Sequence, residues 1–168
     1  MSSEVLSIES EEDGDRLILR FIGEIDETSD FSVVGDIKKK KVIIDLARIV
    51  SLNSLGIRNW VFWIRSIPDS IRVEFTNSPR VVVDQLNVLQ GFKPMDAVVT
   101  SFELPYFCDA CGFESALMLH RGKDYSEGTA DVREQITYKS SIPCTKCGED
   151  MEIDVLEKKY FHFLKYRS

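Results

Sequence analysis

Four cysteines are the residues whose type and spacing point most clearly to chemistry. They form two Cys-x-x-Cys pairs, each followed by a glycine: Cys108, Cys111 and Gly112, then Cys144, Cys147 and Gly148. Two intervening residues make a tight turn that aims both sulfurs at one point, and the glycine allows a left-handed backbone after it. Four thiolates satisfy the tetrahedral preference of Zn²⁺ and leave no open position. The pattern therefore predicts a structural zinc site.

These cysteines have three alternative uses: disulfides, a redox pair or an iron–sulfur cluster. Disulfides need an oxidising compartment, which no export signal supports. A redox pair would leave the second pair unexplained, whereas an iron–sulfur cluster also accepts four thiolates. The 32 residues between Cys111 and Cys144 exceed the usual 15–20 of a compact metal ribbon. We expect the excess to form an extended hairpin, with turns at 122–124 and 126–128.

Catalysis has little support in the sequence. His120 and His162 are its two histidines, and neither has a serine or cysteine nucleophile nearby. His120 is expected in a strand of the hairpin, with a metal-ligand role as the alternative. The chain has no P-loop, no Gly-x-Gly-x-x-Gly and no Gly-x-Ser-x-Gly. We therefore expect a protein that is not an enzyme.

The charge and the hydropathy of the chain limit the classes of partner that it is expected to bind. The chain has 168 residues and a net charge of −7, which argues against a protein that tracks nucleic-acid phosphates. No apolar run approaches the roughly 20 residues of a membrane span. The N-terminus shows no apolar signal segment. These features predict a cytoplasmic protein without membrane or nucleic-acid binding.

The hydrophobic periodicity of the sequence predicts the strands and helices that position the candidate functional residues. Strands are predicted over 17–22, 42–46 and 71–75, with a last one at 98–102 and a shorter one near 5–8. A short helix is expected through 31–34, and longer helices from just after Asn53-Ser54 to about residue 67 and over 81–89. Alternating strands and helices predict an α/β sheet. We place a domain boundary between 104 and 105, with a strand over 151–155 and a terminal helix over 156–166 in a small β domain.

The helix expected after Asn53-Ser54 is apolar most of the way round. Its residues Ile57, Trp60, Val61 and Ile64 have helical spacing and are expected to face the sheet. Phe62 and Trp63 lie off that stripe, so one of them needs another cover. We expect the metal-binding domain or a second copy of the chain to provide it.

Three short motifs occur in order in residues 4–104. They are Gly23-Glu-Ile-Asp26, Val42-Ile-Ile-Asp-Leu46 and Leu52-Asn-Ser-Leu-Gly-Ile57. Together they resemble the STAS domain of anti-sigma-factor antagonists and sulfate transporters. The resemblance implies a mixed sheet with helices on one side. It also implies partner switching with a serine-kinase anti-sigma factor or a phosphatase.

The resemblance also assigns roles to residues at the start of the long helix. The family places a phosphorylated serine there, in the pattern Asp-Ser-Ser-Gly, and Ser54 occupies that position. Asn53 and Leu55 depart from the pattern. Asp26, Asn53, Leu55 and Gly56 are the implied partner surface. Independently, a helix N-terminus suits a phosphate, although the same residues could simply cap the helix.

Two function hypotheses follow from these observations. The first is a regulatory protein-interaction module in which a STAS-like domain, 1–104, docks a partner beside a zinc-ribbon-like domain, 105–168. The alternative is an adaptor of the transcription machinery or of nucleic acid that uses the zinc ribbon.

Overall fold

The chain divides into two compact units, Met1–Thr100 and Ser101–Ser168, which we describe separately as unit 1 and unit 2. The computed structural model describes residues 4–167. The division lies four residues before the position expected from the sequence. It does so because strand β6 (Ser101–Phe107) runs through Leu104 and Pro105 without a break.

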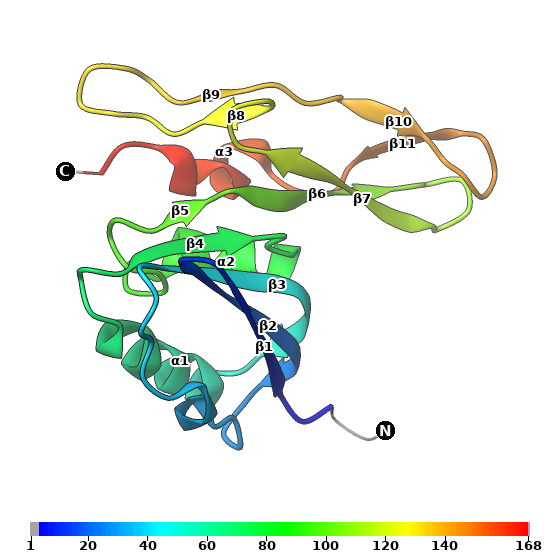
Figure 1. Cartoon of the computed structure of the whole chain (residues 1–168). Coiled ribbons are helices and arrows are strands. Elements are labelled where there is room, and N and C mark those ends of the chain that lie inside the picture. The colour runs from blue at the N-terminus through cyan, green and yellow to red at the C-terminus, as the bar shows by residue number, and fades with distance from the viewer. Residues whose placement is uncertain (1–3, 168) are drawn as a thin grey trace. The chain divides into compact units, whose positions relative to one another are not determined.

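Unit 1 is built on a five-stranded mixed sheet (Figure 1). Its strands lie side by side in chain order: β1 (Ser7–Asp13), β2 (Arg16–Ile25), β3 (Lys41–Leu52), β4 (Arg72–Thr76) and β5 (Val98–Val99). The β1–β2 pair is antiparallel and the other pairs are parallel. The parallel pairs need crossover connections, and these contain η1 (Phe31–Val34), α1 (Ser54–Ser66) and α2 (Arg80–Val88). The predicted α/β class with a mixed sheet is confirmed.

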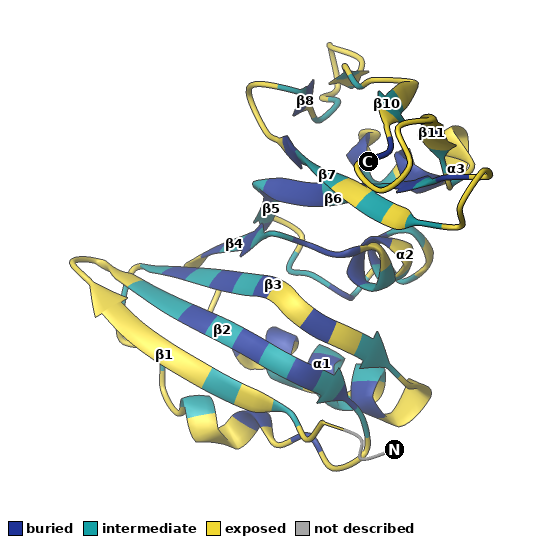
Figure 2. Ribbon diagram, turned by 90° about the vertical axis from the view of Figure 1, so that its right-hand side faces the viewer, coloured by how far each residue is buried: buried dark blue, intermediate teal, exposed yellow. Residues whose placement is uncertain are grey.

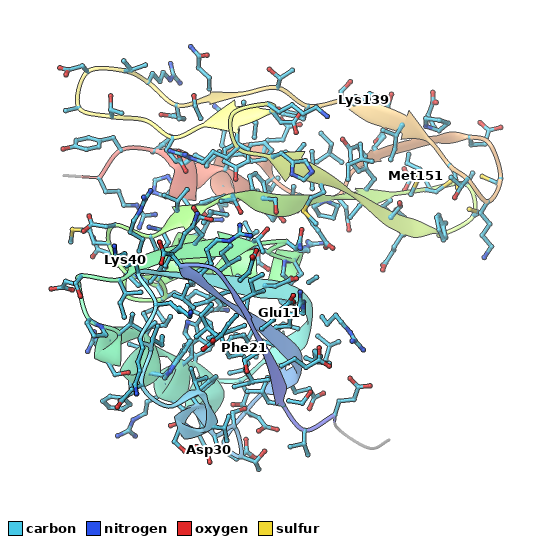
Figure 3. All side chains as sticks on the ribbon, in the orientation of Figure 1. Glu11, Phe21, Asp30, Lys40, Lys139 and Met151 are labelled. Atoms are coloured by element: carbon cyan, nitrogen blue, oxygen red, sulfur yellow. The ribbon has the colours of Figure 1, made fainter. Side chains whose placement is uncertain are left out.

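One face of this sheet forms the core of unit 1 (Figure 2). Alternate residues of the central strands are buried: Leu19, Phe21, Val42, Ile44, Val73 and Phe75. The residues between them, such as Ile18, Arg20 and Ile43, are half-buried. Such alternation is expected when a sheet packs against a helix layer on one face only. Phe21 of β2, labelled in Figure 3, touches Trp60 of α1 with ring centroids 5.4 Å apart.

The expectation that the metal-binding domain or a second copy of the chain covers Trp63 is wrong. Trp63 stacks on Phe31 of η1, with ring centroids 5.6 Å apart and planes 18° from parallel. The short 3-10 helix of the same unit therefore covers this ring, and neither unit 2 nor a second copy is needed for it. Phe62 stays 60% exposed, with the Arg58 guanidinium 5.7 Å from its ring centroid.

Unit 2 is a small antiparallel β structure with a helical C-terminal segment. Its larger sheet has the order β10-β11-β6-β7, in which β7 is Glu114–His120, β10 is Ser141–Pro143 and β11 is Asp150–Ile153. β8 (Tyr125–Ser126) and β9 (Gln135–Ile136) form a separate pair. The chain ends in α3 (Glu157–Tyr160) and η2 (His162–Leu164).

The core of unit 2 is aromatic. The ring of Phe102 on β6 lies 5.0 Å from that of Tyr125 and 6.1 Å from that of Tyr160, measured between centroids. Met151 of β11, labelled in Figure 3, is also buried. Among residues 4–167, no helix has the length and apolar character that crossing a membrane requires.

Candidate metal centre

Two hairpins of unit 2 carry the cysteine pairs. Cys108 and Cys111 lie in the turn between β6 and β7, and Cys144 and Cys147 lie in the turn between β10 and β11. β11 pairs with β6 in antiparallel fashion, with Glu152 opposite Phe107. The start of β11 and the end of β6 are therefore at the same end of the sheet, and the two turns meet there (Figure 1).

The two turns share one backbone pattern. In the first, the Gly112 N–H donates to the Cys108 carbonyl over 2.7 Å, and in the second the Gly148 N–H donates to the Cys144 carbonyl over 2.9 Å. Gly112 and Gly148 have φ angles of 77° and 83°, in the left-handed region that favours glycine. This confirms the reason inferred for a glycine after each cysteine pair.

The four sulfurs form one cluster. The sulfurs of Cys108 and Cys147 are 3.5 Å apart, those of Cys111 and Cys144 are 3.7 Å apart, and all four lie within 4.8 Å of one another. A disulfide would bring a pair to about 2.05 Å. Zn–S bonds of about 2.3 Å in a tetrahedron place the sulfurs about 3.8 Å apart. The cluster therefore has the size that a tetrahedral metal ion requires.

Burial and hydrogen bonds shift the pKa values of the thiols in the cluster in different directions. Burial opposes ionisation of Cys144, but N–H donors of Cys147 and Lys146 outweigh it and lower the pKa of this thiol to about 7. The Lys146 nitrogen lies 3.4 Å from the Cys144 sulfur. The pKa of Cys147 is raised: an N–H of Glu149 favours its thiolate, but the neighbouring thiol of Cys108 and burial oppose it. Four thiolates at this spacing repel one another unless a metal ion neutralises them.

The four cysteines of the cluster differ in their exposure to solvent. Cys108 and Cys144 are buried, and Cys111 and Cys147 are exposed. The exposed charged residues of the two turns and their flanks are mostly acidic: Asp109, Glu114, Glu149 and Asp150 against Lys146. The surface around the sulfurs is therefore negative.

His120 lies away from the sulfurs. It is the last residue of β7 and pairs with Ser101, whereas the cysteines adjoin the opposite end of this hairpin, where Phe107 pairs with Glu114. The strand position expected for His120 is confirmed. The alternative role as a metal ligand is wrong, because the ladder places this residue at the far end from the turn.

The start of α1 brings together the second set of candidate residues. Asn53 is the N-cap, and its side-chain oxygen accepts a hydrogen bond from the Gly56 N–H over 2.8 Å. The Asn53 N–H donates to the Ile25 carbonyl over 3.0 Å, which ties this helix start to the end of β2, next to Asp26. Ser54 and Leu55 form the exposed first turn. Asp26, Asn53, Ser54, Leu55 and Gly56 therefore lie in one place.

Two carboxylates border this place. The Asp26 carboxylate accepts from the Thr28 hydroxyl over 2.6 Å and from the Thr28 N–H over 2.8 Å, and these bonds lower the pKa of Asp26. The Asn53 amide donates to the Glu27 carboxylate over 2.7 Å. The role of Glu27 was missed at the level of sequence, because 26 positions separate it from Asn53 and no motif links them.

The chain matches no model of a known protein family, and no curated protein resembles it in a sequence search.

Proposed function

We propose that this protein is a non-enzymatic regulatory module. Unit 1 would be a STAS-like domain that docks a regulatory protein, such as a serine-kinase anti-sigma factor or a phosphatase, at the start of α1. Unit 2 would be a zinc-ribbon-like domain whose metal is structural. Phosphorylation of Ser54 would control which partner binds.

The grouping of the candidate residues at the start of α1 is the observation that supports this proposal. Ser54 is exposed at the first position of a 13-residue helix, where unpaired N–H groups favour a negative group. A phosphate there would add nearly two negative charges close to Asn53 and its bonded carboxylate, Glu27. Repulsion from that carboxylate would change which partner surface the site accepts.

Separate observations support zinc as the metal of the four-cysteine cluster. The sulfur spacing fits a tetrahedral ion, and four protein ligands leave no position for a reactive water. A four-thiolate iron–sulfur cluster is the competing occupant, and visible absorption distinguishes it from colourless zinc. The negative surface around the turns favours a protein partner over nucleic acid.

Affinity capture with three full-length variants tests the proposed switch. Wild type and Ser54→Ala should capture the same partner, and Ser54→Asp should capture less of it. The loss should be partial, because aspartate carries one charge where phosphoserine carries nearly two. Ser70→Asp is the matched control, since Ser70 is exposed in a turn after α1. Equal capture by all variants, with an unmodified Ser54 peptide in mass spectra of the native protein, would contradict the proposal.

A further inference from the structure

Strand β7 lies at one edge of the four-stranded sheet of unit 2, because the strand order ends with it. All seven of its residues pair with β6, and this ladder has no register shift. On its other side β7 has no neighbouring strand among residues 4–167. An edge of this length presents backbone N–H and C=O groups that can pair with a further strand.

The other sheet edges of the chain are protected against such pairing, whereas β7 is not. Charged side chains, proline and short strands are the usual protection. β1, at the edge of the sheet of unit 1, carries four acids in seven residues. β5 has two residues, and β10 has three and ends in Pro143. Residues 115–119 of β7 are uncharged and contain neither proline nor glycine.

The hydrogen bonds of the β6–β7 ladder show which residues of β7 bond to β6. The Cys108 N–H donates to the Phe113 carbonyl over 2.9 Å, so these two residues form a hydrogen-bonded pair next to the ladder. Bonded and non-bonded pairs alternate in an antiparallel ladder. The residues of β7 whose backbone groups point to β6 are therefore Ser115, Leu117 and Leu119.

The residues between these have backbone groups that point to the open edge. Pro105, which lies opposite Ala116, agrees with this phase, because its carbonyl accepts from the Asp154 N–H on the other side of β6. The backbone of His120 is already bonded to the turn after β7, through the N–H and the carboxylate of Asp124. The free N–H and C=O groups of this edge, within the described part of the chain, are those of Glu114, Ala116 and Met118.

We propose that β7 pairs in antiparallel fashion with β7 of a second copy of this chain, about a two-fold axis at Ala116. In this register Ala116 faces Ala116 of the second copy, and Glu114 faces its Met118. Each such pair exchanges two hydrogen bonds, so every free group of the edge gains a partner. The interface lies in unit 2, does not depend on Ser54 and goes beyond the proposed function.

The symmetry of the edge favours a second copy over a strand of another protein. Pairing about a two-fold axis places a residue opposite itself, so a charged or bulky residue at the axis would oppose it. Ala116 is small, uncharged and exposed. Leu117 and Met118 are half-buried, and pairing removes more of their apolar surface from water. The free groups lie symmetrically about Ala116, so the same three residues satisfy one another.

Sedimentation velocity of the full-length protein, purified without chelator, should show a dimer whose fraction rises with concentration. Ala116→Lys and Ala116→Glu each place like charges face to face, so each should weaken the dimer about fivefold or more. An equimolar mixture of the two variants places lysine opposite glutamate and should restore dimerisation. Ala130→Lys, at an exposed loop position of unit 2, is the matched control and should stay within about twofold of wild type.

Hydrogen exchange of the wild type gives a second measurement, which decides if either variant at Ala116 proves unfolded. The N–H groups of Glu114, Ala116 and Met118 should gain protection as the concentration rises, whereas that of Ser115 should be protected throughout. A chain that stays monomeric, a dimer that neither variant weakens, or a mixture of folded variants that stays monomeric would overturn the proposal. Protection of these groups only after a different protein is added would also overturn it, in favour of a foreign strand.

Discussion

Gly56 lies where the first turn of α1 meets the end of β2. A Cβ atom at this position would be 2.2 Å from the Ile25 carbonyl oxygen and 2.5 Å from the Asp26 nitrogen, both of which are backbone atoms. Backbone cannot move aside as the tip of a side chain can. The glycine is therefore required by close approach, since its φ lies outside the left-handed region.

Gly56→Ala should lower the free energy of unfolding of unit 1 by about 2 kcal/mol or more, because overpacking forces the helix away from the strand. Gly91→Ala is the matched control. Its nearest neighbour would be the flexible end of Arg65 at 3.5 Å, so the change should be neutral or stabilising by about 0.5 kcal/mol. Urea unfolding followed by tryptophan fluorescence measures both, and equal stabilities for the two variants would contradict the contact.

The sulfur site could be predicted from residue types, whereas contacts between distant segments of unit 1 could not. Cys-x-x-Cys spacing fixes the local turn, so the four cysteines that could hold a metal ion can be identified from the sequence alone. The hydrogen bond between Asn53 and Glu27 depends on how β2, β3 and α1 assemble, and no local pattern carries it. The same holds for Trp63, whose cover comes from a residue 32 positions away.

At the scale of elements, hydrophobic patterns located the strands but not their ends. The predicted strands 17–22 and 42–46 lie inside β2 and β3, which extend to Ile25 and Leu52. The extensions include polar residues such as Arg48 and Ser51, which pair through their backbone irrespective of side-chain polarity. Register shifts in the β2–β3 pair also interrupt the alternation that a pattern needs.

The stacking of Trp63 on Phe31 joins α1 to η1. Trp63→Ala should lower the free energy of unfolding of unit 1 by about 3 kcal/mol, because it removes the ring stacked on Phe31 and leaves a cavity. Phe62→Ala removes an exposed ring of the same helix and should cost less than about 1 kcal/mol, chiefly its contact with Arg58. Chemical denaturation of both variants tests the assignment. A larger loss for Phe62→Ala would mean that Phe62 is the covered ring.

At the scale of the whole molecule, the two units should respond differently to loss of the metal. Cys108→Ser removes a buried ligand, and small metal domains derive much of their folding free energy from the ion. Residues 101–168 should then become sensitive to proteases, while the tryptophan fluorescence of unit 1 stays native. A chelator added to the wild type should reproduce this pattern. Loss of both units together, or of neither, would contradict a metal-dependent unit 2.

The metal content of the intact chain decides whether unit 2 holds a structural zinc ion. Native mass spectrometry of protein purified without chelator should show one zinc ion per chain, lost when the thiols of Cys108, Cys111, Cys144 and Cys147 are modified. Elemental analysis should give the same ratio and no iron. Metal-free protein with four reduced thiols and a folded unit 2 would contradict the account.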